Sequence, residues 1–467
     1  MIVRLDFTSE AFFRDPPKAI ATLRVSGPVV ATRFPLVGDV WVTTTHDAAA
    51  QVLKDSANFT LRKEDGDVAG LRWWMPRYVR TMANNMLTMD EPDHTRLRSI
   101  VDEAFRRRAI VAMEPHIRAI ADGLADELFS AGSPADLVQR YARILPLAVI
   151  SELLGLPLAD RPRFIAWANT MSSLTNVVSF FRLLFAFRKM RAYLDRQLQV
   201  ARERGGEGLI AELVQVEREG GQITPDEMVS MVFLLLAAGA ETTTHLISGS
   251  AYELLRSPDL RDWLEQDWSR VGLAVEEFLR FVSPVQFSKP RYVRRDVVVE
   301  GVRLSKGDRV MAMLAAANMD PAIHDRPERL DLERKPNRHV SFGTGIHFCL
   351  GHQLARIEAA CALEALFVRW PKLGLAVDPA EVHWRKRPGL RAIAKLPVTE
   401  THGTPATARG EANIDRSLTA AENAKAPLQV KKPPADDSRR SHSLVSGGGG
   451  ERDSHHAHDE AGKGGGR

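Results

Sequence analysis

Residues 341–351 read Ser-Phe-Gly-Thr-Gly-Ile-His-Phe-Cys-Leu-Gly, so a single cysteine, Cys349, stands in a loop with three glycines. Glycine permits backbone turns and close approaches that a Cβ would block. From Leu354 to about Trp370 apolar residues recur at helical spacing, and Pro371 ends the pattern. We therefore expect Cys349 at a helix N-terminus, where free N–H groups and the helix dipole favour a thiolate over a thiol.

The loop alone leaves the role of this cysteine open. Such a thiolate can be a metal ligand, a nucleophile or a redox sensor, and a free cysteine can also be an inert core residue. No CxxC motif or His/Cys pair at zinc-binding spacing surrounds Cys349, which argues against zinc. The other cysteine, Cys361, lies beside Ala359, Ala360 and Ala362 within the expected helix and is interpreted as core.

A second unusual stretch, Ala238-Gly-Ala-Glu-Thr-Thr-Thr244, lies in a long apolar helix. A capping box at 224–227 and a Ser-Pro-Asp start at 257–259 bound roughly 30 residues of helical sequence. Glycine costs about 1 kcal/mol relative to alanine in a helix, and β-branched threonines are also poor helix formers. Several unfavourable residues at one place indicate a functional site; the alternative is a tolerated kink in a core helix.

The pattern Phe342-Gly343-x-Gly345-x-His347-x-Cys349-x-Gly351 resembles the haem-binding loop of the cytochrome P450 family. The resemblance implies that the cysteine is the axial ligand of the iron in haem b (iron protoporphyrin IX). It also implies that the glycines, Gly343 among them, let the loop lie against the porphyrin, and that Phe342 packs over the sulfur.

Glu277 and Arg280 stand three residues apart, some 70 residues before the cysteine. An isolated Glu-x-x-Arg is most often a surface ion pair of little energetic weight. In its position, however, this one is similar to the family's ExxR helix, where the pair is buried and structural. A further arginine often joins that pair, and we take Arg329 as the candidate.

Four basic residues resemble the family's haem-propionate ligands: His94, Arg98, Arg291 and His347. His94 and Arg98 are spaced i,i+4 and share one helix face. Two carboxylates inside an apolar cavity require cationic or hydrogen-bonding partners. Arg294 and Arg295 lie close to Arg291 and are rivals for its role.

The stretch within the long helix resembles the family's AGxxT signature, which crosses the distal face of the haem. By that resemblance Gly239 makes room for dioxygen, Thr242 hydrogen-bonds the oxygen bound to iron, and Glu241 helps to deliver protons. An acid and a hydroxyl suit a site where oxygen must be protonated twice.

Composition limits the other possibilities. The 467 residues are 44% hydrophobic and 26% charged, with a net charge of +4, too little to indicate a nucleic-acid partner. Two cysteines suit a reducing cytoplasm. The N-terminus is too charged for a signal peptide, and the most apolar run, 229–240, is too short to span a bilayer, so no membrane span is expected.

The expected architecture is a mainly α cytochrome P450 fold with small β-sheets, in one haem domain over residues 1–400. Strands are expected near 31–44, 296–302 and 309–313. Residues 401–467 have almost no large apolar side chains and are expected to form a disordered low-complexity tail.

The resemblance implies a monomeric, cytoplasmic monooxygenase that inserts one atom of O2 into an apolar small molecule, with electrons from a separate ferredoxin and an NAD(P)H-dependent reductase. A peroxide-dependent enzyme and a haem sensor or carrier are alternatives, and the Glu241-Thr242 pair argues against both. Candidate substrate-lining residues are Trp73, Trp74, Met75, Met86, Leu87, Phe180, Phe181, Phe185, Leu235, Leu236, Val285, Gln286 and Phe287.

Overall fold

The computed structural model describes residues 6–400, apart from 36, 65, 67, 69–74, 103–106 and 172–176. Side chains at 107–109, 158, 161, 168–171 and 177–181 are also outside the described part. The expected tail at 401–467, both tryptophans at 73 and 74, and the side chains of Phe180 and Phe181 therefore lie outside the described residues.

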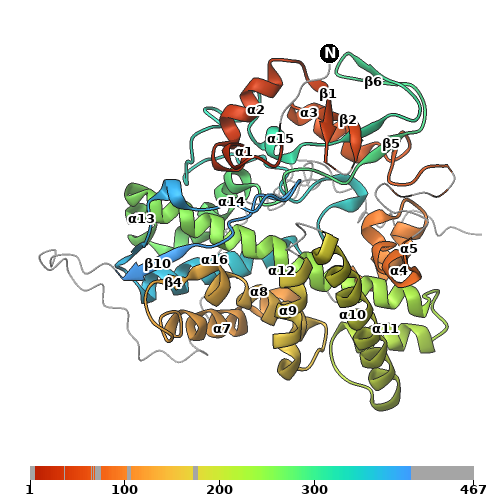
Figure 1. The fold of residues 1–467 in the computed structure, drawn as a ribbon, viewed down its shortest axis with the longest axis horizontal. Helices are drawn as coiled ribbons and strands as arrows, with labels where there is room; N and C mark the ends of the chain where they lie inside the picture. The colour runs from red at the N-terminus through yellow and green to blue at the C-terminus, as the bar shows by residue number, and fades with distance from the viewer. Residues whose placement is uncertain are drawn as a thin grey trace, which may run out of the picture.

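The described residues are mainly helical, as the sequence predicts, and α12 (Pro225–Arg256) is the longest helix among them (Figure 1). The other helices of eight or more residues are α2 (Pro16–Arg24), α3 (His46–Lys54), α5 (Asp93–Asp102), α7 (Glu114–Asp126), α8 (Ile144–Leu153), α9 (Arg161–Met171), α10 (Val177–Arg204), α11 (Leu209–Arg218), α13 (Pro258–Glu265), α14 (Val271–Val282) and α16 (His352–Arg369). Shorter helices are α1 (Glu10–Arg14), α4 (Arg77–Ala83), α6 (Arg107–Ala112) and α15 (Leu314–Asn318).

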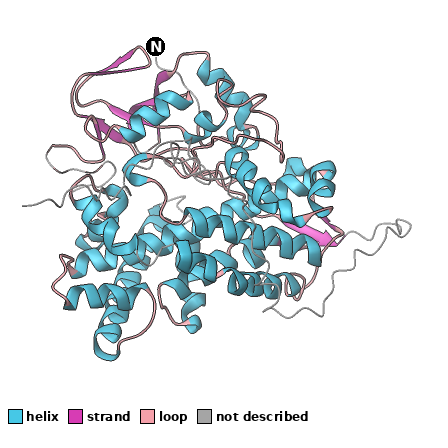
Figure 2. Cartoon of the chain, turned by 180° about the vertical axis from the view of Figure 1, so that it is seen from behind, coloured by secondary structure: helices cyan, strands magenta, loops and turns pink. Residues whose placement is uncertain are grey.

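The strands form small sheets, most of them gathered at one corner of the molecule (Figure 2). One sheet has the order β1-β2-β8-β5-β3, with β2 and β8 parallel and the other pairs antiparallel; a second has the order β4-β10-β9, and β6 pairs with β7. The strands are β1 (Val29–Phe34), β2 (Gly38–Thr43), β3 (Phe59–Thr60), β4 (Ala135–Asp136), β5 (Arg291–Val293), β6 (Val297–Val299), β7 (Val302–Leu304), β8 (Arg309–Met311), β9 (Leu373–Leu375) and β10 (Pro397–Glu400). The three regions predicted as strands therefore contain strands.

Helix α12 begins where the sequence predicts. The Thr224 hydroxyl accepts a hydrogen bond from the Glu227 amide at 3.2 Å, and the Glu227 carboxylate accepts one from the Thr224 amide at 2.8 Å. The helix then runs through the centre of the helical body, in contact with α4, α8, α14 and α16 (Figure 1). By length and composition it could cross a membrane, but 67% of its apolar window is buried, so it is the central core helix.

The hydrophobic core surrounds α12 on several sides. One large cluster joins α7, α14 and α16 to the N-terminal helices, a second joins α8, α10, α11 and the first half of α12, and a third lies under the five-stranded sheet. Cys361 is 1% exposed within the first cluster, which confirms its interpretation as a core residue. Phe287 packs against Phe7 and Phe34 and also belongs to the core.

Candidate active site

The cysteine loop is a closed turn directly before α16. The Cys349 amide donates a hydrogen bond to the Phe342 carbonyl at 3.0 Å, and a short 3-10 turn spans Gly345–His347. Gly343 and Gly345 have φ values of 70° and 74°, which favour glycine. A Cβ at Gly345 would also lie 2.6 Å from the Leu53 carbonyl oxygen. The backbone therefore requires glycine at both positions, as the sequence predicts.

The protein environment does not by itself favour a thiolate at Cys349. This free cysteine is half-buried, and helix α16 begins only at His352. Desolvation raises the pKa of Cys349, although the Gly351 amide and the charges of Arg98 and Arg356 oppose that shift. Without a bound metal ion, desolvation therefore outweighs the effect of the nearby helix N-terminus on the pKa of the Cys349 thiol. A thiol that binds a metal ion loses its proton through coordination.

Glu277 and Arg280 form a buried ion pair, with the Arg280 side chain 0% exposed. Two guanidinium nitrogens of Arg280 donate to the Glu277 carboxylate at 2.8 and 2.7 Å, and the carboxylate also accepts from the Asp331 amide and Asn337. The predicted pair is thus confirmed as buried and completely hydrogen-bonded.

The predicted third member of this pair is wrong. Arg334, and not Arg329, approaches Glu277, with its Nε 3.2 Å from the carboxylate. Arg329 contributes only its backbone carbonyl, which accepts a hydrogen bond from Arg280 at 2.9 Å. The sequence could not separate the two arginines, because the chain between them has no helical or strand periodicity that would show their directions.

The four predicted basic residues lie together on the side of α5 that faces the cysteine loop. The rings of His94 and His347 are 4.3 Å apart between centroids, and the charges of Arg98 and Arg291 both act on His347. Arg98 donates to the Phe348 carbonyl at 2.8 Å, which joins α5 to the loop. The structure therefore brings together residues that are up to 253 positions apart in the sequence.

This basic group lacks acceptors for several of its buried polar atoms. His94 Nδ1, His347 Nε2 and Arg291 Nε have no hydrogen-bond partner among the described residues. Burial lowers the pKa of Arg291 to about 10, and burial with the neighbouring charges lowers the pKa of His347 to about 3. Asp90 is near Arg291, but its carboxylate already accepts from the Leu61 and Arg62 amides. A buried basic group with free donors indicates an anionic ligand.

The middle of α12 carries the residues expected beside dioxygen. The Thr242 hydroxyl donates to the Ala238 carbonyl, four residues earlier, at 2.8 Å. A Cβ at Gly239 would lie 3.1 Å from Ile150, so the glycine allows α8 to pack closely on α12. Its predicted role in making room for dioxygen stays a prediction.

Comparison with known proteins identifies the fold. A family model described as cytochrome P450 matches residues 194–370. Vitamin D(3) 25-hydroxylase of Pseudonocardia autotrophica is 39% identical over 400 residues, which cover 84% of this chain and 96% of that protein. The chain belongs to the cytochrome P450 family.

Other P450s agree with this assignment over the same length. The 6-deoxyerythronolide B hydroxylase of Saccharopolyspora erythraea is 35% identical and covers 84% of this chain and 98% of its own. The crystal structure of the myxobacterial cytochrome P450 CYP267B1 in complex with myristic acid superposes with a TM-score of 0.79 at 37% identity, over 85% of this chain and 99% of that chain.

Membership of the family establishes the cofactor and the class of reaction. P450s bind haem b through a cysteine thiolate, and the free buried donors beside the cysteine loop fit the two propionates of that cofactor. The protein is a haem-thiolate monooxygenase that inserts one atom of O2 into an apolar small molecule, with electrons from a ferredoxin and its reductase.

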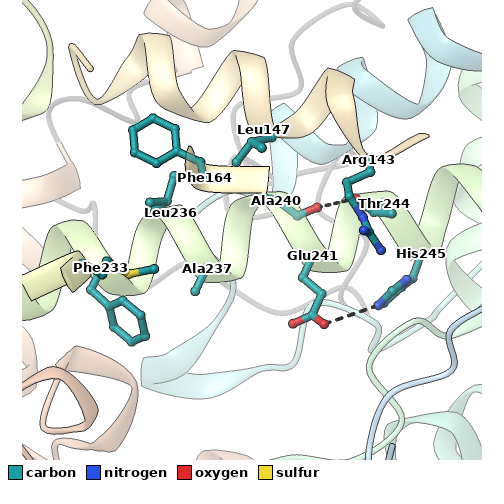
Figure 3. Close-up of a pocket in the computed structure, with 11 residues that line it drawn as sticks. Arg143, Leu147, Phe164, Phe233, Leu236, Ala237, Ala240, Glu241, Thr244 and His245 are labelled. Atoms are coloured by element: carbon teal, nitrogen blue, oxygen red, sulfur yellow. Dashed lines mark hydrogen bonds and ion pairs between the residues drawn. The ribbon is translucent and has the colours of Figure 1, made fainter. Parts of the chain in front are cut away.

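The P450 also has a cavity against the flank of α12, lined by residues of α8, α9, α10 and α12 (Figure 3). Apolar side chains, including Phe164, Phe233 and Leu236, lie towards one end, and Arg143, Glu241 and His245 gather at the other (Figure 3). Leu236, a predicted lining residue, is therefore beside a cavity. Phe185, another such residue, is 57% exposed.

The Glu241 side chain points in a direction between the cavity and the face of α12 that carries Thr242, because consecutive helical residues point about 100° apart. Its carboxylate forms an ion pair with Arg387 and is 3.9 Å from His245 Nε2, too far for a hydrogen bond. Burial lowers the pKa of His245, whereas Glu241 acts to raise it.

The sequence reasoning missed these neighbours of Glu241. His245 could have been found, since it stands four residues after Glu241 on a helix. Arg387 is 146 residues away in an irregular segment, and no sequence signal connects the two.

Proposed function

We propose that Cys349 is the iron ligand of this P450 and that His94, Arg98, Arg291 and His347 hold the haem propionates. The observation that carries the proposal is the set of three buried polar nitrogens beside the cysteine loop, His94 Nδ1, His347 Nε2 and Arg291 Nε, that have no partner among the described residues. Propionate oxygens can accept hydrogen bonds from cluster atoms that otherwise have no partner, and a charge-assisted bond of this kind contributes about 1.5–3 kcal/mol. Phe342 and Gly343 shape the loop on the sulfur side.

Haem bound by a thiolate supplies the activation of dioxygen and its insertion into a C–H bond. In our proposal Glu241 helps to deliver the protons for that activation, and the Thr242 hydroxyl hydrogen-bonds the dioxygen. The Thr242 hydroxyl donates to the Ala238 carbonyl, so its oxygen is left with lone pairs that can accept a proton or a hydrogen bond. Glu241, held by Arg387, is the acid beside it, placed between the cavity and the Thr242 side of α12.

We infer that the substrate is a large, mostly apolar molecule. The relatives whose names state a substrate act on vitamin D(3) and 6-deoxyerythronolide B, among others. Ferric P450 titrated with vitamin D(3) and with 6-deoxyerythronolide B should show a low-spin to high-spin shift for at least one of them. A shift produced only by small polar compounds would contradict the inference.

We also propose that residues 1–400 form the haem domain, that the protein is monomeric, and that it is cytoplasmic. The relatives match about 400 residues at nearly their full length, which supports the domain boundary. Light scattering after size exclusion tests the oligomeric state. Truncation after residue 400 with full haem content would support the boundary, and loss of haem would contradict it.

The iron ligand is tested by the absorption spectrum of the reduced, CO-bound protein. Wild type and Cys361→Ser should show the red-shifted Soret band of a thiolate-bound haem, whereas Cys349→Ser should lack it. Cys361 is the matched control because it is the other cysteine of the chain and is buried in α16. A normal band in Cys349→Ser would disprove the assignment.

The proton-supply role is tested by the yield of product per NAD(P)H consumed. Thr242→Ala should keep haem and electron uptake but divert most electrons to hydrogen peroxide. Thr244→Ala is the matched control, because Thr244 makes the same bond to the carbonyl four residues earlier but points to the opposite side of α12. Equal coupling in the two variants would remove Thr242 from the proposed role.

A further inference from the structure

A group of largely buried charged and polar residues lies beside Phe342 of the cysteine loop, and neither haem binding nor proton delivery uses it. Arg356 projects from the second turn of α16, one turn after the helix begins, and its guanidinium carbon lies 4.6 Å from the centroid of the Phe342 ring. A guanidinium at this distance over an aromatic face makes a cation–π contact. Phe342 is the loop residue whose carbonyl accepts the Cys349 amide.

Glu276 holds the guanidinium in place. Arg356 Nε and Nη2 each donate a hydrogen bond to one oxygen of the Glu276 carboxylate, and the bond from Nη2 is 2.9 Å long. A third, Nη1, lies 2.9 Å from His352 Nδ1. A bidentate pair of this kind fixes the plane of the guanidinium as well as its position. The Arg356 side chain is only 14% exposed, so water screens its charge weakly.

His339 connects this pair to the start of the loop. Its Nε2 lies 3.0 Å from the Glu276 carboxylate, and its Nδ1 accepts a hydrogen bond from the Ser341 amide at 3.3 Å. The backbone contact assigns the ring proton to Nε2, which then donates to Glu276. Burial would raise the pKa of Glu276, but hydrogen bonds from Arg356 and His339 lower it to about 2. The carboxylate therefore stays ionised at neutral pH.

We propose that Arg356, which its ion pair with Glu276 holds over the Phe342 ring, raises the reduction potential of the haem bound at Cys349. The inference rests on the assignment of Cys349 as the iron ligand. Reduction adds one electron from the ferredoxin to the ferric haem, so the ferrous site carries one more negative charge. A fixed cation stabilises that added charge, and the low dielectric of the interior strengthens its effect. Arg356 acts by its charge, and the contact with the Phe342 ring helps to fix where that charge lies.

Replacing Arg356 and replacing Glu276 should shift the reduction potential of the haem in opposite directions. Arg356→Gln removes the cation and leaves Glu276, so the ferrous form should be disfavoured. Glu276→Gln removes the anion and leaves Arg356, so the ferrous form should be favoured. At a given solution potential we expect the ratio of ferrous to ferric haem to change about tenfold in each case, which is about 59 mV for one electron. A residue that only supports the loop would shift both variants in the same direction.

The experiment is a spectroscopic redox titration of the substrate-free holoenzyme. Arg369→Gln is the matched control: its guanidinium lies 4.6 Å over the Trp370 ring and pairs with Asp126, but it stands 13 residues further along α16, about 20 Å away. Opposite shifts in the Arg356 and Glu276 variants, with Arg369→Gln unchanged, support the proposal. Unchanged potentials, or shifts of the same sign, overturn it.

The CO-bound spectrum of every variant separates this proposal from the assignment of the iron ligand. A red-shifted Soret band shows that the thiolate is intact, so a potential measured in that variant reports on charge alone. If Arg356→Gln loses the band, Arg356→Lys and Glu276→Gln decide the matter. Lysine keeps the positive charge, so Arg356→Lys should have the wild-type reduction potential. That result, together with a raised potential in Glu276→Gln, supports the proposal. Unchanged potentials in both variants overturn it.

Discussion

Two buried charged groups of this P450 differ in how completely their hydrogen bonds are satisfied. The ExxR cluster, formed by Glu277, Arg280 and Arg334, has several protein donors on its carboxylate, and Arg280 also donates to three backbone carbonyls. The cluster that we propose to hold the propionates, called the propionate cluster below, consists of His94, Arg98, Arg291 and His347. It keeps three buried donor or acceptor atoms without a partner among the described residues. A buried group with all its hydrogen bonds supports the fold, and one that lacks them is prepared for a ligand.

The largest effect should follow from breaking the ExxR cluster. Arg280→Met leaves the Glu277 carboxylate buried with one cation fewer, and loss of one partner of a buried pair costs about 3–5 kcal/mol. Urea unfolding should show this loss with or without haem. If the variant were destabilised only in the haem-bound protein, the ExxR cluster would not differ from the propionate cluster.

The second prediction concerns the propionate cluster. Arg291→Gln should leave the free energy of unfolding of the apoprotein within about 1 kcal/mol of wild type but weaken haem retention by about 10–100-fold, the value of one charge-assisted hydrogen bond. Haem transfer to apomyoglobin measures the dissociation rate.

Arg295→Gln is the matched control, because Arg295 lies on the same segment but is exposed and donates to Asn58. Equal haem loss in the two variants would mean that position along the segment, and not the buried site, determines the effect.

A histidine beside the ExxR cluster gives a pH-dependent prediction. Burial and the charges of Arg280 and Arg334 lower the pKa of His324 to about 3, so the folded protein keeps this ring neutral. The unfolded chain binds a proton near pH 6.5, so stability is full above that pH and falls as the pH drops towards 3. His324→Leu should reduce the dependence of unfolding free energy on pH by up to about 1.4 kcal/mol per pH unit. Urea unfolding between pH 7 and pH 4.5 measures it, and an unchanged dependence would contradict the assignment.

The smallest effect should come from the exposed edge of the propionate cluster. Arg98 pairs with Asp102 at 2.9 Å, but the Asp102 side chain is 55% exposed. Asp102→Asn should change the free energy of unfolding by only about 0.3–0.5 kcal/mol, as is usual for such helix pairs. Haem retention should stay at the wild-type level, since Arg98 still donates to the Phe348 carbonyl. A large loss of haem would show that Asp102 orients Arg98.

Local patterns in the sequence predicted many of the elements that position the site. The capping box at Thr224, the strands near 31–44, 296–302 and 309–313, and the glycines of the cysteine loop all depend on interactions within a few residues. Such interactions repeat from protein to protein, so a short pattern is enough to predict them. Arg334, which pairs with Glu277 in place of the predicted Arg329, could not be found from the sequence, because their segment has no periodic structure that would show which side chain faces Glu277.

By itself, the sequence determined the family resemblance, the mainly α architecture and the choice of Cys349 over Cys361, because motif and order along the chain carry that information. Only the tertiary structure decided three other points. Burial raises the pKa of Cys349 more than the helix N-terminus lowers it, Arg387 pairs with Glu241, and the ion pair with Glu276 holds Arg356 over the Phe342 ring. Each of these depends on side chains from distant segments that share one buried volume. Desolvation and ion pairing depend on which side chains surround a group in the folded protein, and a local sequence pattern does not contain that information.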